Sequence, residues 1–235
     1  FGRQLLEWLQ TYTFPEELRF RSKSYADEVA ALFFQEMFRV GTTTVMSFAT
    51  THPHSVEAFF EEAERQGIQG LCGLTGIDRE GTAPDEYRDT PQTFYDGSKE
   101  LIERFHGKGR NLYSIAPRFA FGSTDQQLAM AGKLAQEHPD CWIQTHLSEN
   151  PTEVSSVLEF FPDCNDYLGV YEKHGLVRKK FVAGHSIYLC EDEFRRMGEA
   201  EASVAFCPAS NLFLGSGFFQ WDRANHHGVR WGLGC

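Results

Sequence analysis

The sequence predicts an α/β protein, and within that class a (β/α)8 barrel of the TIM type that holds about seven of its eight strands. Apolar, β-branched runs alternate along the 235 residues with stretches of helical period, which is the pattern of βα units around a parallel sheet. An open doubly wound sheet is the alternative, but neither GxGxxG nor GxxxxGK(S/T) follows the early strands. Seven strand-like runs therefore fit a barrel that lacks one strand.

The predicted elements alternate as βα units require. Runs of β-branched and aromatic residues mark the strands, and apolar residues three to four positions apart mark the helices. The strands are expected at 42–49, 68–75, 112–116, 141–145, 181–184, 203–206 and 229–233. The helices are expected at 24–39, 54–66, 91–105, 123–137, 151–174 (broken near Pro162) and 191–198.

Capping residues support several of these boundaries. Thr90-Pro91 and Asn150-Pro151 each put a capping side chain before a proline at the first helical position. Glu153 would complete a capping box with Asn150.

Glycines are expected to end four of the helices in the left-handed conformation, namely Gly41, Gly67, Gly175 and Gly198. No internal repeat, low-complexity tract or linker interrupts the pattern. Residues 1–235 are therefore expected to form part of a single barrel domain.

Composition and charge narrow the class of ligand. The chain has 22 Lys and Arg against 33 Asp and Glu, a formal net charge of −11. Nucleic acid and an acidic membrane surface are therefore not expected as partners, and a small uncharged or weakly polar molecule fits better. No apolar run is long enough to span a membrane. The six cysteines are scattered without a CxxC pair, which favours the cytoplasm.

Polar residues follow two neighbouring central strands, and in such barrels reactive groups cluster at strand carboxyl ends. His146 comes at the end of one strand, Glu149 follows in the loop, and His185 ends the next strand. An imidazole there is a candidate metal ligand, and a carboxylate three residues later can handle the protons of a bound water. The alternative is structural, a packed histidine beside a helix-start glutamate.

Arg118 and Phe119 end the preceding strand. A guanidinium at the mouth of an acidic barrel would offer a planar fork to a carbonyl or anionic oxygen, and the phenyl ring could stack on a ligand ring. The alternative for the arginine is an ion pair with one of the abundant carboxylates.

Other patterns carry less weight. His52 and His54 form an HxH pair, but the proline between them and the nearby helix start favour a loop or capping role. The histidines expected to be solvated at helix ends or in loops are His106, His138, His174, His226 and His227. The chain contains no GxSxG elbow, no recognisable Cys–His signature and no HxE with PCxxC pattern.

Seven motifs, taken together and in this order, resemble the guanine deaminases of the amidohydrolase superfamily. They are LLEWLQTYTFP at 5–15, VGTTTV at 40–45, DGSKELIERFHGKGR at 96–110, APRF at 116–119, THLSENPTEV at 145–154, GHSIYL at 184–189 and CPASNLFLGSG at 207–217. The resemblance implies a metallo-dependent hydrolase barrel with one zinc ion, hydrolytic deamination of guanine in purine catabolism or salvage, and a homodimer.

The resemblance also implies roles for individual residues. His146 matches the zinc ligand of the fifth strand, and His185 matches a sixth-strand histidine that orients the attacking hydroxide. Glu149 matches the proton shuttle.

Four further residues match the purine site of that family. Arg118 and Phe119 match the pair that contacts the purine, with the arginine facing its carbonyl oxygen. The backbone around Leu147 and Ser148 would lie against the ring.

The remaining zinc ligands of the family, an HxH and an aspartate, have no match in the chain. The HxH would precede Phe1, and the aspartate would directly follow Cys235. We therefore expect a fragment that lacks the first strand and the end of the last, and that is inactive alone.

Two other functions remain open at this point. One keeps the fold and the metal but changes the ring, as in a triazine hydrolase or another purine or pyrimidine deaminase. The other is a metal-free, non-catalytic barrel fragment with a binding or structural role.

Overall fold

The computed structural model describes residues 4–234 and shows the expected α/β fold. The strands are β1 (Thr44–Met46), β2 (Gln69–Cys72), β3 (Thr75–Gly76), β4 (Leu112–Pro117), β5 (Trp142–Leu147), β6 (Phe181–His185), β7 (Ser203–Phe206) and β8 (Arg230–Leu233). Each of the seven predicted strands is found, although β1 is shorter than expected.

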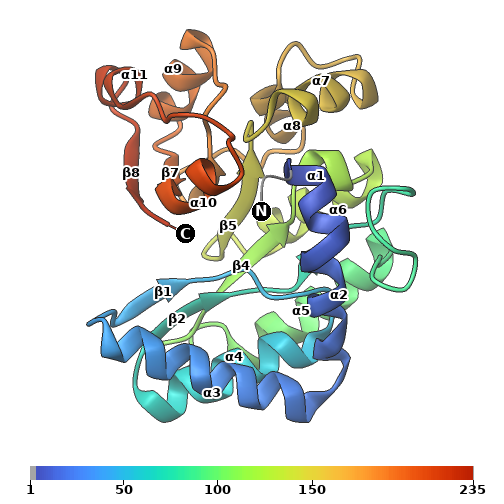
Figure 1. Ribbon diagram of the computed structural model, residues 1–235, viewed down its shortest axis with the longest axis vertical. Helices are drawn as coiled ribbons and strands as arrows, with labels where there is room; N and C mark the ends of the chain where they lie inside the picture. Colours follow the sequence, from blue (N-terminus) through green and yellow to red (C-terminus); the bar gives the residue numbers. More distant parts are fainter. Residues whose placement is uncertain (1–3, 235) are drawn as a thin grey trace.

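The strands form one curled parallel sheet (Figure 1). Their order is β1-β2-β4-β5-β6-β7-β8, and β3 pairs with β4 beside this path. Within residues 4–234 the end strands β1 and β8 do not pair with each other. The expected partial barrel of about seven strands is confirmed.

The six predicted helical regions are confirmed, and the one broken near Pro162 is two helices. They are α3 (Lys23–Arg39), α4 (Pro53–Gln66), α5 (Pro91–Phe105), α6 (Asp125–Glu137), α7 (Pro151–Phe160), α8 (Tyr167–Lys173) and α9 (Glu191–Glu199). The capping box of Asn150 and Glu153 is present at α7. Thr90 caps α5 through a box with Thr93.

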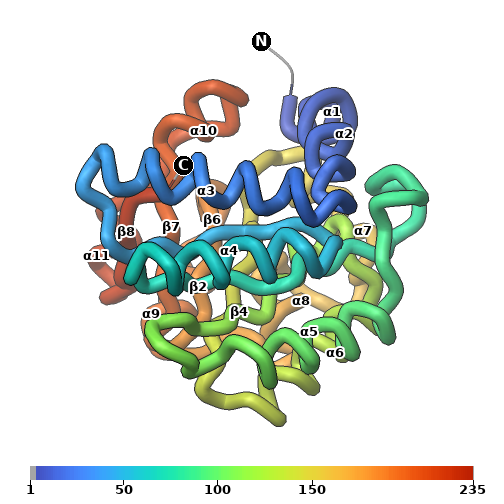
Figure 2. Tube along the Cα trace, turned by 90° about the horizontal axis from the view of Figure 1, so that it is seen from below, coloured from blue at the N-terminus to red at the C-terminus, as the bar shows by residue number. Residues whose placement is uncertain are grey.

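Several short helices were not predicted. They are α1 (Leu5–Trp8), the π-helical η1 (Leu9–Thr13), α2 (Phe14–Glu17), the 3-10 turns η2 (Leu18–Arg21) and η3 (Ala120–Gly122), α10 (Pro208–Phe213) and α11 (Trp221–His226). Residues 5–21, which comprise α1 to η2, are called the N-terminal segment below. Figure 2 shows α1, α2 and α10 at the same end of the molecule.

The predicted strand 68–75 is interrupted at Gly73. A Cβ atom there would lie 1.7 Å from the backbone carbonyl oxygen of Ser114, so β4 approaches too closely for any other residue. The next amide, that of Leu74, bonds to the hydroxyl of Tyr113 at 2.9 Å instead of to a strand. The run therefore becomes β2 and the short β3.

The expectation for Gly198 was wrong. Gly41, Gly67 and Gly175 do have positive φ values, but Gly198 lies inside α9 and does not. A Cβ atom at Gly198 would lie 2.0 Å from the carbonyl oxygen of His227, so close packing requires this glycine.

Two further observations concern the chain as a whole. Within residues 4–234, no helix combines the length and the apolar character needed to cross a membrane. The five cysteines in that part of the chain form no disulfide with one another.

Candidate active site

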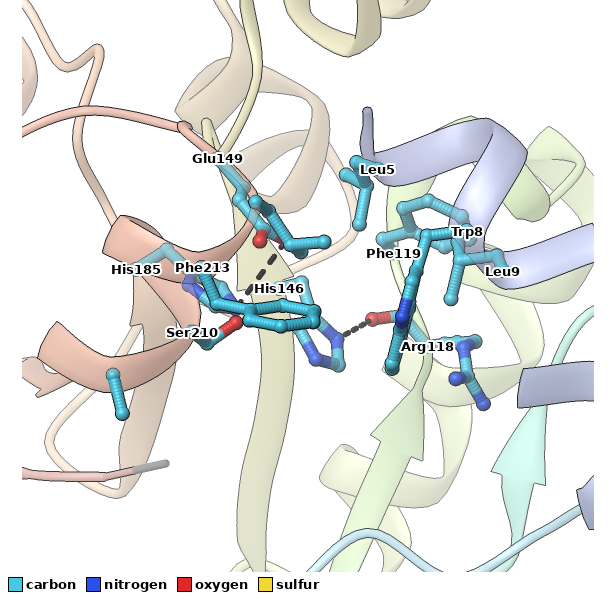
Figure 3. A pocket seen from close by; sticks show the side chains of 12 residues that line it. Leu5, Trp8, Leu9, Arg118, Phe119, His146, Glu149, His185, Ser210 and Phe213 are labelled. Atoms are coloured by element: carbon cyan, nitrogen blue, oxygen red, sulfur yellow. Dashed lines mark hydrogen bonds and ion pairs between the residues drawn. The ribbon is translucent and has the colours of Figure 1, made fainter. Parts of the chain in front are cut away.

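A cavity of about 480 Å³ lies at the carboxyl ends of β4, β5 and β6. Its wall combines side chains from these strand ends with side chains from the N-terminal segment and the α10 region (Figure 3). It is lined by Leu5, Trp8, Leu9, Arg118, Phe119, His146, Glu149, His185, Ala209, Ser210, Phe213 and Leu214. The candidate residues from three successive strand ends therefore share one cavity.

His146 precedes the last residue of β5, and its ring lies between Phe48 and His185. Its Nδ1 lies 2.7 Å from the carbonyl oxygen of Arg118. Because a carbonyl oxygen only accepts, Nδ1 carries the proton and Nε2 keeps its lone pair. Burial, with a smaller contribution from the charge of Arg118, lowers the pKa of His146 to about 3. The ring is therefore neutral at neutral pH and can bind a cation through Nε2.

His185 is the last residue of β6, and its φ of 65° turns the chain out of the strand. Its Nδ1 lies 2.7 Å from Oδ1 of Asn211 on α10. Since the amide oxygen accepts, the lone pair of His185 belongs to Nε2. Burial lowers the pKa of His185, which favours the neutral ring.

Glu149 lies in the loop between β5 and α7 and is 2% exposed. Its Oε2 is 3.3 Å from Nε2 of His185, and the two side chains point toward each other (Figure 3). Burial raises the pKa of Glu149 to about 7, although Ser216 and Arg118 oppose this shift. A carboxyl group that titrates near neutral pH beside an imidazole lone pair can accept and release a proton.

Arg118 lines the cavity, but its guanidinium is also ion-paired. Nη1 and Nη2 donate to the two carboxylate oxygens of Glu17, at 2.9 and 3.0 Å. Tyr87 donates its hydroxyl proton to the same carboxylate. Burial works to lower the pKa of Arg118, but the neighbouring charge of Glu17 outweighs it and raises that pKa.

The ion pair occupies only one edge of the guanidinium. Nε of Arg118 makes no hydrogen bond to the described residues, and the arginine still lines the cavity. The Nε–Nη2 edge can therefore donate to a ligand oxygen. The ion-pair alternative and the ligand-binding role are thus compatible.

Of the other three predicted substrate-contact residues, one lines the cavity and two do not. Phe119 lines the cavity with its ring edge-on to His146, 6.4 Å between centroids. Leu147 and Ser148 are buried but do not line it. The carbonyl of Ser148 accepts hydrogen bonds from the amides of Ile187 and Tyr188, so its contact with a ring stays a prediction.

Sequence reasoning missed several residues of the site. Asn211 orients His185, Glu17 holds Arg118, and Trp8 contributes to the apolar wall. Asn211 belongs to the CPASN motif and Trp8 to LLEWL. Both motifs were recognised in the sequence, but neither residue was assigned a role. The partner of Arg118 could not be found, because 101 positions separate the two residues.

Neither histidine of the HxH pair lines the cavity. The expected capping role is not found, because the N-cap residue His52 makes no side-chain capping hydrogen bond. His52 is the residue before α4, and His54 lies inside that helix and contacts Glu57. The expectation of solvated histidines was wrong for His106, His174 and His227, whose side chains are only 11%, 7% and 15% exposed. They lie beside Asp140, Asp125 and Glu191, respectively.

Another group of possible metal ligands, His106, Asp140 and Cys141, lies outside this cavity. His106 is not available as a ligand, since its Nδ1 accepts from the amide of Tyr113 and its Nε2 donates to Asp140. Burial raises the pKa of Cys141 to about 12, so its thiol stays protonated.

Comparisons with known proteins agree over nearly the whole chain. A model of the amidohydrolase family matches residues 2–235. The guanine deaminase of Escherichia coli K12 is 46% identical over 234 residues, which cover 100% of this chain and 53% of that protein. Mouse guanine deaminase is 35% identical over 232 residues, covering 98% and 51% respectively. The chain spans about half the length of the curated relatives it matches.

Solved structures give the same result. Guanine deaminase from Bradyrhizobium japonicum superposes with a TM-score of 0.97 at 51% identity, covering 100% of this chain and 50% of that one. The guanine deaminase of C. acetobutylicum with guanine bound in its active site gives 0.93 at 29%, covering 100% and 56%. A triazine hydrolase from Arthrobacter aurescens shares the fold, with a TM-score of 0.89 at 18% identity over 99% of this chain and 54% of that one.

Proposed function

The chain belongs to the amidohydrolase family, and on that premise we propose that the complete protein hydrolyses guanine to xanthine and ammonia. The observation that carries the proposal is the contact of 3.3 Å between Glu149 and His185, in a cavity shared with His146. The relatives named guanine deaminase, at 46% and 35% identity, support guanine as the substrate.

The side chains of the cavity fit a metal ion, and we propose that it is one zinc ion. His146 would hold it through Nε2, with the other protein ligands outside this chain. The neutral imidazole of His146, with its lone pair on Nε2, is a donor that zinc accepts readily, and the ring of His185 lies 5.5 Å away between centroids, where it can contact a bound water. When bound, zinc supplies a Lewis acid that makes water a nucleophile near neutral pH.

Glu149 carries protons in the proposed reaction. Guanine and water give xanthine and ammonia, so both protons of the water must leave its oxygen. Glu149 accepts the first and transfers it to the ring nitrogen beside the amino-bearing carbon, then moves the second to the leaving amine. His185, held by Asn211 at 2.7 Å, keeps the attacking water in line with that carbon.

The substrate is oriented by the cavity wall opposite Glu149 and His185. Arg118 donates from its Nε–Nη2 edge to the carbonyl oxygen of guanine, and Phe119 contacts the ring. The backbone of Leu147 and Ser148 supports the ring from the β5 end. A ring that lacks the carbonyl oxygen would leave these buried donors unpaired, which disfavours adenine.

Activity measurements on the full-length protein test the proposed substrate. Guanine should be converted to xanthine, whereas adenine and ammeline should react at least about 100-fold more slowly. Faster turnover of ammeline would instead indicate a triazine hydrolase. A purified protein without stoichiometric metal and without turnover of any of the three would indicate a metal-free role.

Replacing the shuttle tests the mechanism. Glu149→Gln should lower kcat about 100-fold or more while zinc content stays unchanged. Glu159→Gln, an exposed charge change on α7, is the matched control and should keep wild-type activity. Wild-type kcat in Glu149→Gln would contradict the assignment.

We also propose a domain organisation, a cellular compartment and an oligomeric state for the protein. Residues 1–235 are taken as part of one barrel domain, because the described strands belong to one connected sheet. The six cysteines are scattered along the sequence without a CxxC pair, which is compatible with the cytoplasm. A homodimer rests on family resemblance alone, and sedimentation of the full-length protein measures it.

A further inference from the structure

Glu153, the third residue of α7, is fully buried next to the proposed shuttle. Its Oε2 accepts from the backbone amide of Glu149 at 3.0 Å and from that of Asn150 at 3.1 Å. Its Oε1 accepts from the hydroxyl of Tyr167 on α8 at 2.6 Å. One carboxylate therefore joins the loop after β5 to two helices.

We propose that Glu153 is a positioning residue for the reaction, which holds the backbone of Glu149 so that its carboxylate stays beside His185. This inference rests on the proposed role of Glu149 as proton shuttle. Glu153 itself does not line the cavity, so it acts through Glu149 alone.

The hydrogen bonds explain why this carboxylate fixes the shuttle. The amides of Glu149 and Asn150 belong to the two peptide units that flank the Cα atom of Glu149, and Glu153 holds both. The first of these units is also held at its other end, where the carbonyl of Ser148 accepts from Ile187 at 3.0 Å. With both units fixed, the direction of the Cα–Cβ bond of Glu149 is set.

The backbone of this loop needs support because one of its residues has an uncommon conformation. Ser148 adopts a φ of 50°, which non-glycine residues seldom do without support. Tyr167 in turn keeps Glu153 in place from α8. Loss of the carboxylate would free the flanking amides, and a displacement of about 1 Å at a reacting group can cost about 100-fold in rate.

The chain contains a matched control for a purely structural role. Glu193 occupies the same third position of α9, is likewise buried, and accepts from the amides of Cys190 at 2.8 Å and Leu168 at 3.1 Å. Neither of these partners lines the cavity. Both glutamates cap a helix, but only Glu153 holds the shuttle.

The test compares Glu153→Ala with Glu193→Ala in the full-length, metal-loaded protein. Both should unfold at a lower temperature, since each loses a helix cap. Only Glu153→Ala should lose kcat, by about 10-fold or more, with KM for guanine within about threefold of wild type. Glu153→Gln should recover most of the kcat, because its amide oxygen can still accept from both backbone amides.

Hydrogen exchange adds a readout that does not depend on turnover. The amides of Glu149 and Asn150 should exchange faster in Glu153→Ala than in wild type or Glu193→Ala. If Glu153→Ala does not fold, Tyr167→Phe replaces it, and should lower kcat severalfold at constant KM while speeding exchange at Glu149.

The outcomes separate this inference from the proposed function. Equal kcat in the wild type and the Glu153 or Tyr167 variant, with unchanged exchange at Glu149, would overturn the positioning role and leave only a helix cap. A wild-type protein that does not deaminate guanine would overturn the proposed function instead. Exchange at Glu149 would still show whether Glu153 holds the loop.

Discussion

Replacing Glu17 by Ala tests whether the N-terminal segment holds Arg118. The two side chains are 18% and 9% exposed and share two hydrogen bonds at 2.9 and 3.0 Å. Removing one partner of a buried pair leaves the other charge unsatisfied, which typically costs 3–5 kcal/mol. Because Glu17 keeps some solvent contact, we expect a loss near the lower limit, about 3 kcal/mol of unfolding free energy.

Urea unfolding of the full-length protein measures this loss, and guanine kinetics measure its effect on the site. KM should rise about 10-fold, since the guanidinium can turn toward water once the carboxylate is gone. Glu16→Ala is the control, because Glu16 pairs with Arg19 on the surface, where both side chains are more than half exposed. Equal unfolding midpoints for the two variants would refute the anchoring role.

Three further predictions concern the site and the sheet. Asn211→Ala should lower kcat about 10-fold without loss of zinc, because His185 loses the partner that orients it; unchanged kinetics would contradict this. In metal-free protein, burial raises the pKa of Glu149 from 4.5 to about 7. The contribution of the neutral carboxyl group to the stability of the folded protein is therefore fully present below pH 4.5, and it is lost as the pH rises through about 7. Glu149→Gln should therefore raise the melting temperature at pH 8 but not at pH 4.5, and an equal effect at both would contradict the assignment. Gly73→Ala should strongly destabilise the protein, since its Cβ would meet a β4 carbonyl at 1.7 Å, whereas Gly232→Ala, with open space around it, should unfold like wild type.

Local signals predicted most of the fold. Asn150 with Glu153 and Thr90 with its following proline marked helix starts that the structure has at those positions. The helix end predicted at Gly198 was wrong. A glycine after an apolar helical run is typical of a helix end, whereas here the glycine permits close contact with the carbonyl of His227. Such a contact depends on tertiary packing, which a local pattern does not contain.

The site was predictable only in part for the same reason. His146, Glu149 and His185 follow strands, and parallel strands bring their carboxyl ends together. Glu17 and Asn211 lie in short helices without a clear apolar period, so their elements were missed along with their roles. The N-terminal segment also contains Pro15, which lies in the first turn of α2, where a proline is tolerated.

The N-terminal segment supplies Leu5, Trp8 and Leu9 to the cavity and Glu17 to Arg118. A chimera that exchanges only the three apolar residues with those of a relative would alter the shape of the ligand space and keep the native counter-ion. Grafting residues 5–21 as one cassette would transfer shape and charge together. Redesign for a different heterocycle should therefore treat these seventeen positions as a single exchangeable unit.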